Sequence, residues 1–175
     1  MSRFCRITVP CRLAAMLCWG VAIVAASTAW AADASAPISA AALADWEAHG
    51  RAEGLARPDT PCQDFLLAMG QKPDYVEYLG CERGDDLQMK PLTANYRVSG
   101  AAAVRMEGHL HEVFGMPLLE FACCGWGSRP YSTRYPSDGT TVMVGMGTET
   151  PSYPREQWQK IPYFSITVAV FRELP

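Results

Sequence analysis

The first 31 residues have the composition of a segment that is removed before the protein folds, and this decides which residues can form the folded domain. Their only charged side chains are three arginines, and an apolar run over residues 13–26 follows. The segment closes on Ala29-Trp-Ala31, where two small residues suit signal peptidase. A basic start, an apolar middle and a small-residue end predict a cleavable signal peptide over residues 1–31, with Ala32 as the first residue of the exported chain.

Export predicts that the protein is periplasmic or secreted, with membrane contact only through the signal peptide before cleavage. The alternative is a retained anchor, because the stretch from Leu13 to Trp30 is near the lower length limit for a membrane-spanning helix. Cleavage removes 31 of 175 residues and three of 15 basic side chains, which leaves 144 residues with 12 basic and 18 acidic side chains, a net charge of −6. These charges are dispersed, and this argues against nucleic-acid binding.

The cysteines constrain the exported chain next, because thiols in an oxidising compartment form disulfides. Three of the seven cysteines leave with the signal peptide, and Cys62, Cys81, Cys123 and Cys124 remain as disulfide candidates. A bond between the two adjacent cysteines is disfavoured, since the small ring strains the backbone. Two arrangements stay open: Cys62 and Cys81 each bonded to one member of the adjacent pair, or Cys62 bonded to Cys81 with Cys123 and Cys124 as thiols.

The exported chain divides into an N-terminal leader and helix over residues 32–58 and a single domain over residues 59–175. Ser39 is the predicted N-cap of the first helix, and Thr60 followed by Pro61 predicts the start of a second, short one. The clearest helix spans residues 100–114. Its predicted buried stripe contains Ala103, Met106, Leu110, Val113 and Phe114, and its predicted polar face contains Arg105, Glu107, His111 and Glu112.

The strand pattern predicts an α+β fold class. Alternating or apolar runs indicate strands near residues 75–81, 92–98, 118–126, 140–146 and 163–171. From about residue 92 the order is strand, helix, strand, strand, helix, strand. This order is typical of a ferredoxin-like (βαββαβ) fold, an antiparallel sheet with helices on one face. A cystatin-like sheet wrapped on the central helix is the alternative.

No complete catalytic, metal or cofactor motif is present in the sequence. His109 and His111 lie two residues apart on a helix, so their side chains point about 200° apart and cannot share a ligand. Cys123 and Cys124 lack the Cys-x-x-Cys spacing that zinc sites use, and on a strand they point to opposite faces. We therefore assign no catalytic residue, no metal and no cofactor, and binding is favoured over enzymatic activity.

A loop rich in aromatic and arginine residues is the candidate binding surface. The composition is typical of interface hot spots, and another protein is the expected partner. The candidate residues are Trp126, Arg129, Tyr131, Arg134 and Tyr135. In the alternative interpretation this is an ordinary loop whose aromatic side chains fold back on the sheet.

These observations favour a disulfide-stabilised binding or interaction module, of inhibitor or immunity type. The alternative is a thiol redox protein or enzyme that uses Cys123 and Cys124, because adjacent thiols can close a strained and easily reduced ring.

Several short strings give the chain a resemblance to a known family. They are Cys62-Gln-Asp-Phe-Leu, Lys72-Pro, Cys81, Thr93-Ala-Asn-Tyr-Arg-Val-Ser-Gly, Ala103-Val and Cys123-Cys-Gly-Trp. With them, the chain from about Pro61 to Val170 resembles a bacterial exported family known as domain of unknown function 4952. The resemblance implies export and a cysteine framework, and it implies no activity.

Overall fold

The computed structural model describes residues 37–135, 138–149 and 153–175, and residues 37–175 form one compact unit. The predicted signal peptide, residues 1–31, and residues 32–36 of the predicted leader lie outside the described residues. Within the described part of the chain, no helix is long and apolar enough to cross a membrane.

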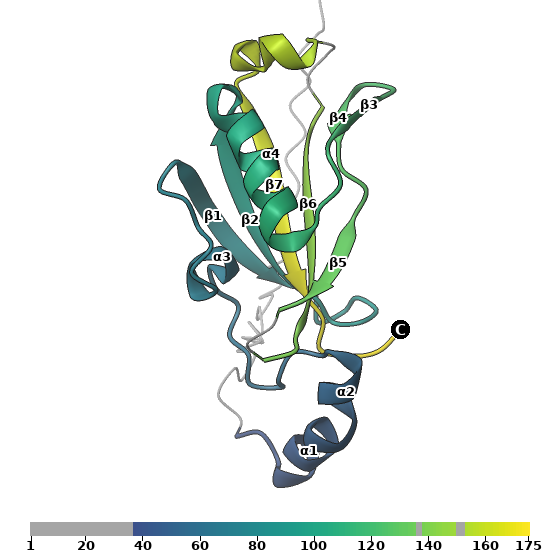
Figure 1. Cartoon of the computed structure of the whole chain (residues 1–175). Coiled ribbons are helices and arrows are strands. Elements are labelled where there is room, and N and C mark those ends of the chain that lie inside the picture. The colour runs from purple at the N-terminus through teal and green to yellow at the C-terminus, as the bar shows by residue number, and fades with distance from the viewer. Residues whose placement is uncertain (1–36, 136–137, 150–152) are drawn as a thin grey trace, which may run out of the picture. The chain divides into compact units, whose positions relative to one another are not determined.

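An antiparallel sheet of seven strands forms the centre of the domain (Figure 1). The strand order is β1-β2-β7-β6-β4-β3, and β5 also pairs with β6. Together with the helices, this sheet places the protein in the α+β class, as predicted. The strands are β1 (Val76–Arg83), β2 (Leu92–Ser99), β3 (Glu120–Ala122), β4 (Gly125–Gly127), β5 (Tyr131–Arg134), β6 (Thr141–Thr148) and β7 (Tyr163–Val170).

The predicted ferredoxin-like order is not confirmed. A split βαβ unit brings parallel strands into one sheet. Every strand pair in the described residues is antiparallel, and β6 pairs with β7. The cystatin-like alternative is not confirmed either, and only the antiparallel sheet with accompanying helices is established.

The helix α4 (Gly100–Phe114) lies across β2, β7 and β6 and covers one face of the sheet (Figure 1). Strand residues alternate between this core face and the opposite face, so Val98 of β2 and Phe164 of β7 are buried beneath the helix. The helix contributes Ala103, Met106, Leu110 and Phe114 to the core, as predicted. Two predictions for this helix were wrong: Val113 is exposed, and Glu107, expected on the polar face, is buried.

The N-terminal helical segment consists of α1 (Ala40–Asp45), the π-helix η1 (Trp46–Gly50) and α2 (Arg51–Glu53). The Ser39 hydroxyl accepts a hydrogen bond from the Ala42 N–H at 3.1 Å, which confirms the predicted N-cap. The segment ends at Gly54, which has a left-handed backbone, and the Gly54 carbonyl accepts a hydrogen bond from the Thr141 N–H of β6 at 2.7 Å. This main-chain contact connects the segment to the sheet.

The second helix, α3 (Phe65–Ala68), begins later than predicted. Asp64 caps it in place of Thr60, because the Asp64 carboxylate accepts a hydrogen bond from the Leu67 N–H at 3.0 Å. The Leu66 N–H donates to the Tyr96 hydroxyl of β2 at 3.0 Å in a buried position. Burial raises the pKa of Tyr96 well above its usual range, so this phenol stays neutral beneath α3.

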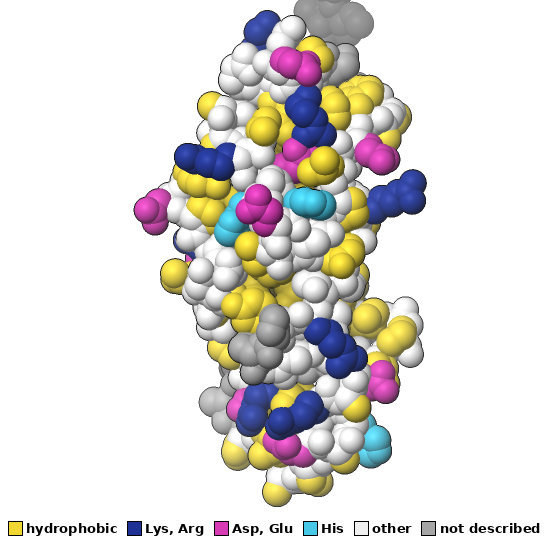
Figure 2. Space-filling view, in the orientation of Figure 1, with side chains coloured by type: hydrophobic (Ala, Val, Ile, Leu, Met, Phe, Trp, Pro, Cys, Tyr) yellow, Lys and Arg dark blue, Asp and Glu magenta, His cyan; other side chains and the backbone are white. Residues whose placement is uncertain are grey.

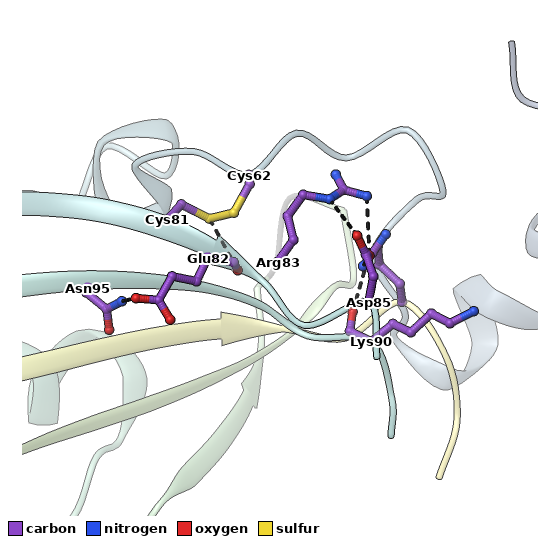
Figure 3. The surroundings of a disulfide bond; sticks show 8 residues. Cys62, Cys81, Glu82, Arg83, Asp85, Lys90 and Asn95 are labelled. Carbon is purple, nitrogen blue, oxygen red and sulfur yellow. Dashed lines mark hydrogen bonds and ion pairs between the residues drawn. A yellow bond between two sulfur atoms is a disulfide. The ribbon is translucent and has the colours of Figure 1, made fainter. Parts of the chain in front are cut away.

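A disulfide joins the segment before α3 to the sheet (Figure 3). Cys62 bonds to Cys81 of β1 with a Cα–Cα distance of 5.5 Å, across a sequence separation of 19 residues. This is the second of the two arrangements that the sequence left open. Beside the bond, the Asn95 amide of β2 donates to the Glu82 carboxylate at 3.3 Å. Closing a loop of this length stabilises a fold by about 3 kcal/mol in the chain-entropy estimate.

Candidate functional site: the β3–β4 hairpin

The hairpin of β3 and β4 replaces the continuous strand that the sequence predicts over residues 118–126. Phe121 pairs with Trp126 and Ala122 pairs with Gly125, so Cys123 and Cys124 form the two-residue turn. The sequence interpretation missed this turn, although Gly125 was a signal for it. A Cβ on Gly125 would lie 1.9 Å from the Thr148 carbonyl oxygen of β6, so only glycine allows this close approach.

The turn has an uncommon backbone conformation at Cys123. Its φ angle is +54°, and the Cys124 N–H donates to the Ala122 carbonyl at 2.6 Å. A hydrogen bond that closes three residues, with positive φ at the middle residue, defines a γ-turn. This conformation is rare, and it strains the backbone of a residue that has a side chain. The backbone therefore holds the two cysteines in a conformation that an ordinary strand would not produce.

Both cysteines of the turn are exposed free thiols. Their sulfur atoms lie 2.7 Å apart, with the Cys124 thiol donating to Cys123. This hydrogen bond raises the pKa of the Cys124 thiol, and the negative charge of Glu149 acts in the same direction. The arrangement in which Cys62 and Cys81 bond to this pair is absent from the structure. The predicted opposite orientation of the two side chains is also wrong, because the cysteines occupy a turn and not a strand.

Trp126 fixes the hairpin from its inner side. Its indole ring packs edge-on against Trp158 of the 3-10 helix η2 (Arg155–Lys160), with ring centroids 5.1 Å apart. The indole N–H donates to the Tyr153 carbonyl at 2.9 Å. Phe121, the partner of Trp126 across the hairpin, also packs edge-on against it at 5.7 Å. Trp126, predicted as part of a binding loop, therefore anchors the hairpin to the domain.

A buried ion pair fixes the chain where it enters β3. Glu107 of α4 is only 3% exposed, and its carboxylate pairs with the guanidinium of Arg155. The same carboxylate accepts a hydrogen bond from the Leu119 N–H at 2.7 Å, and Arg155 donates to the Leu119 carbonyl at 2.8 Å. The Arg155 guanidinium also lies over the Trp158 ring at 4.5 Å. Both main-chain polar groups of Leu119 are thus held directly before the hairpin.

The hairpin and the residues before it expose apolar side chains. Leu118 is 54% exposed and Phe121 is 44% exposed, and Ala122, Cys123 and Cys124 are exposed beside them. Hydrophobic side chains gather over this hairpin in the space-filling view (Figure 2). We call these five residues the hairpin patch. Strand β3 lies at one end of the sheet order, so in the described residues its outer edge pairs with no other strand.

The remaining residues of the predicted binding loop are separated by the fold. Tyr131 and Arg134 belong to β5, which pairs with β6, and the Arg134 guanidinium donates to the Ala52 carbonyl at 2.9 Å. The Tyr135 hydroxyl donates to the Met69 carbonyl at 2.7 Å. Arg129 is exposed in the connection between β4 and β5. The structure therefore brings Trp126 and Arg129 to the hairpin, places Tyr131 and Arg134 in β5 and places Tyr135 directly after it.

The two histidines of α4 act in local structure. The His109 Nε2 lies 2.8 Å from the Gln71 carbonyl, and the His111 Nδ1 lies 2.9 Å from the Met116 carbonyl, so each ring can donate to main chain. Each histidine therefore has its own main-chain partner. Among residues 37–135, 138–149 and 153–175, no group of three or more His, Cys, Asp or Glu side chains is arranged to hold a metal ion.

Comparison with known proteins gives one match. Residues 50–126 match the family described as a domain of unknown function (DUF4952). The matched range ends at Trp126 and contains all four cysteines of the described chain. No curated protein and no solved structure matches the chain. The match supports a domain of unknown function over residues 50–126, whereas the expected resemblance extended to about Val170, and it connects the disulfide and the hairpin to that domain.

Proposed function

We propose that this protein is an exported, disulfide-stabilised domain that binds another protein through the hairpin patch. The observation that carries the proposal is an exposed apolar surface on a hairpin that the rest of the domain holds in place. The hairpin patch exposes apolar side chains at a sheet edge, and Trp126 and the Arg155–Glu107 ion pair fix the hairpin to the domain. Exposed apolar edges are normally protected in monomeric proteins, so their presence indicates a contact surface.

The geometry favours an extended segment of the partner as the bound element. The outer edge of β3 presents main-chain donors and acceptors, which an extended chain can pair with as an added strand. Phe121 and Leu118 then supply apolar area on either side of Glu120. Because the hairpin is already fixed, little conformational freedom is lost on binding. This mode agrees with the inhibitor or immunity-type role that the sequence favours.

Export rests on the first 31 residues. The three arginines, the apolar run and Ala29-Trp-Ala31 predict cleavage before Ala32. The test is expression in a bacterium with a periplasm, followed by fractionation and mass spectrometry. We expect the protein in the exported fraction with Ala32 at its N-terminus. A full-length protein that stays in the membrane fraction would support the retained anchor instead.

Binding is tested with two matched double variants. In Leu118→Ser/Phe121→Ser the hairpin patch loses its large apolar side chains. In the control, Leu67→Ser/Leu87→Ser, two leucines that are exposed elsewhere receive the same change. Each protein is immobilised and exposed to the exported proteins of the producing organism, and any retained protein is purified and titrated by calorimetry.

We expect one partner that the wild type and the control retain with similar Kd. The hairpin variant should bind it at least ~10-fold more weakly, which corresponds to about 1.4 kcal/mol. Equal affinity of the two double variants would refute the role of the hairpin patch, and a wild type that retains nothing above background would refute the binding function.

A further inference from the structure

The two thiols of the hairpin turn are placed for chemistry of their own. Cys123 and Cys124 are exposed, adjacent in sequence and separated by 2.7 Å between their sulfur atoms. Cys62 and Cys81 already bond to each other, so no other cysteine of the described chain is a free partner for this pair. In an oxidising compartment, two such thiols are the first to meet an incoming disulfide.

The turn explains why these thiols face one another. On a strand, adjacent side chains point to opposite faces of the sheet. Positive φ at Cys123 and the hydrogen bond from Cys124 N–H to the Ala122 carbonyl turn the chain, and both cysteines are exposed with their sulfurs side by side. The conformation is unfavourable for a residue with a Cβ, and such outliers concentrate at functional sites. Trp126 and the support before β3 keep the hairpin in place while the turn itself stays accessible.

The surroundings leave room for a second molecule. Cys124 lines a groove of about 740 Å³ together with Glu120, Arg129 and Glu149. This groove is open on the same hairpin, so a peptide can lie beside Cys124, and its charged groups can pair with the charges of both signs there. Arg129 is exposed here and offers a guanidinium to a carboxylate of such a peptide.

We infer that Cys123 and Cys124 form a dithiol site that exchanges with the disulfide bonds of peptides or proteins. This inference does not depend on the proposed binding function, because the exchange needs no resident partner. Its substrates share one chemical feature, an accessible disulfide, which a small peptide or a folded protein can supply.

The reaction is a two-step exchange in which atoms and electrons balance. The Cys123 thiolate attacks one sulfur of the substrate disulfide, the substrate S–S bond breaks, and the released substrate thiolate takes up a proton. The Cys124 thiol then loses its proton and attacks the Cys123 sulfur, which expels the second substrate thiol. The protein dithiol is oxidised to one disulfide, and the substrate disulfide is reduced to two thiols.

The order of attack follows from the hydrogen bond between the sulfurs. Cys124 donates and Cys123 accepts, so we assign the first attack to the accepting sulfur of Cys123. The raised pKa of Cys124 agrees with its role as the second thiol to react. The closed ring of adjacent cysteines is strained and therefore readily reduced, so the exchange is reversible and the oxidised pair can return its disulfide to a substrate dithiol.

The experiment uses the protein from Ala32 to Pro175, which contains the whole compact unit, after mild reduction that leaves Cys62–Cys81 intact. Thiols are counted with a chromogenic disulfide before and after incubation with oxidised glutathione, and in a parallel arm with insulin as the protein disulfide. Masses are recorded in both arms. Cys123→Ser, Cys124→Ser and the double serine variant are treated in the same way.

We expect two reactive thiols in the native wild type and none after exchange, with a mass lower by two hydrogens. Cys124→Ser should accumulate the mixed disulfide at Cys123, and the double variant should not react. A dithiol titration should reopen Cys123–Cys124 at a concentration at least ~10-fold lower than Cys62–Cys81 requires.

Three outcomes would overturn the inference. They are a wild type that reacts no faster than the single-cysteine variants, oxidation that gives only covalent dimers, and a Cys123–Cys124 bond as resistant to reduction as Cys62–Cys81. Trapping of the mixed disulfide only in Cys123→Ser would overturn the assigned order of attack. Reaction in the glutathione arm alone would restrict the substrates to small peptides. None of these results affects the binding test, which measures the affinity of the Leu118→Ser/Phe121→Ser variant for the partner.

Discussion

The ion pair between Glu107 and Arg155 gives the sharpest prediction about how the hairpin is held. Arg155→Met removes the guanidinium and leaves the Glu107 carboxylate, which is 3% exposed, with the Leu119 N–H as its remaining hydrogen-bond donor in the described structure. Removing one partner of a buried ion pair costs about 3–5 kcal/mol. The Arg155 side chain is 33% exposed, so water replaces part of the lost interaction. We therefore expect a loss of about 2–3 kcal/mol in the free energy of unfolding.

A second substitution tests the cause of that loss. Glu107→Gln keeps an oxygen that can accept the Leu119 N–H and removes the charge, so alone it should destabilise the protein by about 1–2 kcal/mol. In the Arg155→Met background the same change removes an unpaired buried charge. In that background we expect Glu107→Gln to raise the free energy of unfolding by about 1 kcal/mol. The same substitution is then destabilising in the wild type and stabilising in Arg155→Met.

Urea unfolding of the four proteins measures this double-mutant cycle, and hydrogen exchange measures the local effect. In Arg155→Met the amides of β3 and β4 should exchange faster, while those of β2 and β7 change little. Arg129→Met is the matched control, because this arginine is exposed beside the same hairpin; its effect should stay within about 0.5 kcal/mol. Equal destabilisation by Glu107→Gln in both backgrounds would refute the reasoning.

Three further predictions concern the rest of the fold. Replacing both Cys62 and Cys81 by alanine should lower the free energy of unfolding by about 3 kcal/mol in urea titrations, since the closed loop is lost; an unchanged midpoint would contradict this. Burial raises the pKa of Tyr96 in the folded state, whereas in the unfolded chain this pKa is about 10. The contribution of Tyr96 to the free energy of unfolding is therefore constant below about pH 10 and falls as the pH rises above it. Tyr96→Phe should flatten that alkaline decline, and a decline of the same slope would argue against Tyr96 as its source. Gly125→Ala should loosen the hairpin in hydrogen exchange because its Cβ would meet main chain, whereas Gly127→Ala, with open space, should not.

Local patterns in the sequence were sufficient for the main elements. The helix α4 follows from its spacing of apolar residues, and β2 and β7 follow from alternation, because both periodicities are properties of neighbouring residues. Ser39 capped the first helix as expected. Thr60 did not cap the second, since Asp64 was an equally good acceptor closer to Phe65 and local preference could not choose between them.

The candidate site shows where local patterns fail. Glu107 follows the polar periodicity of a surface position, yet Arg155, which lies in a different element, compensates its charge and allows burial. The Cys-Cys-Gly string was interpreted as strand because its neighbours are apolar. The structure makes it a turn, and the close approach of Gly125 to Thr148 in β6 exists only once the sheet has formed. The aromatic residues of the predicted loop likewise found partners in distant segments.

By itself, the sequence determined the α+β class and the position of helix α4, because composition and short-range periodicity carry that information. It also determined the candidate export signal. Only the tertiary structure decided that Cys62 bonds to Cys81 and that Cys123 and Cys124 remain thiols on a supported hairpin. The physical reason is that a disulfide or a buried ion pair needs two residues to meet, and the fold alone fixes the distance between residues far apart in the chain.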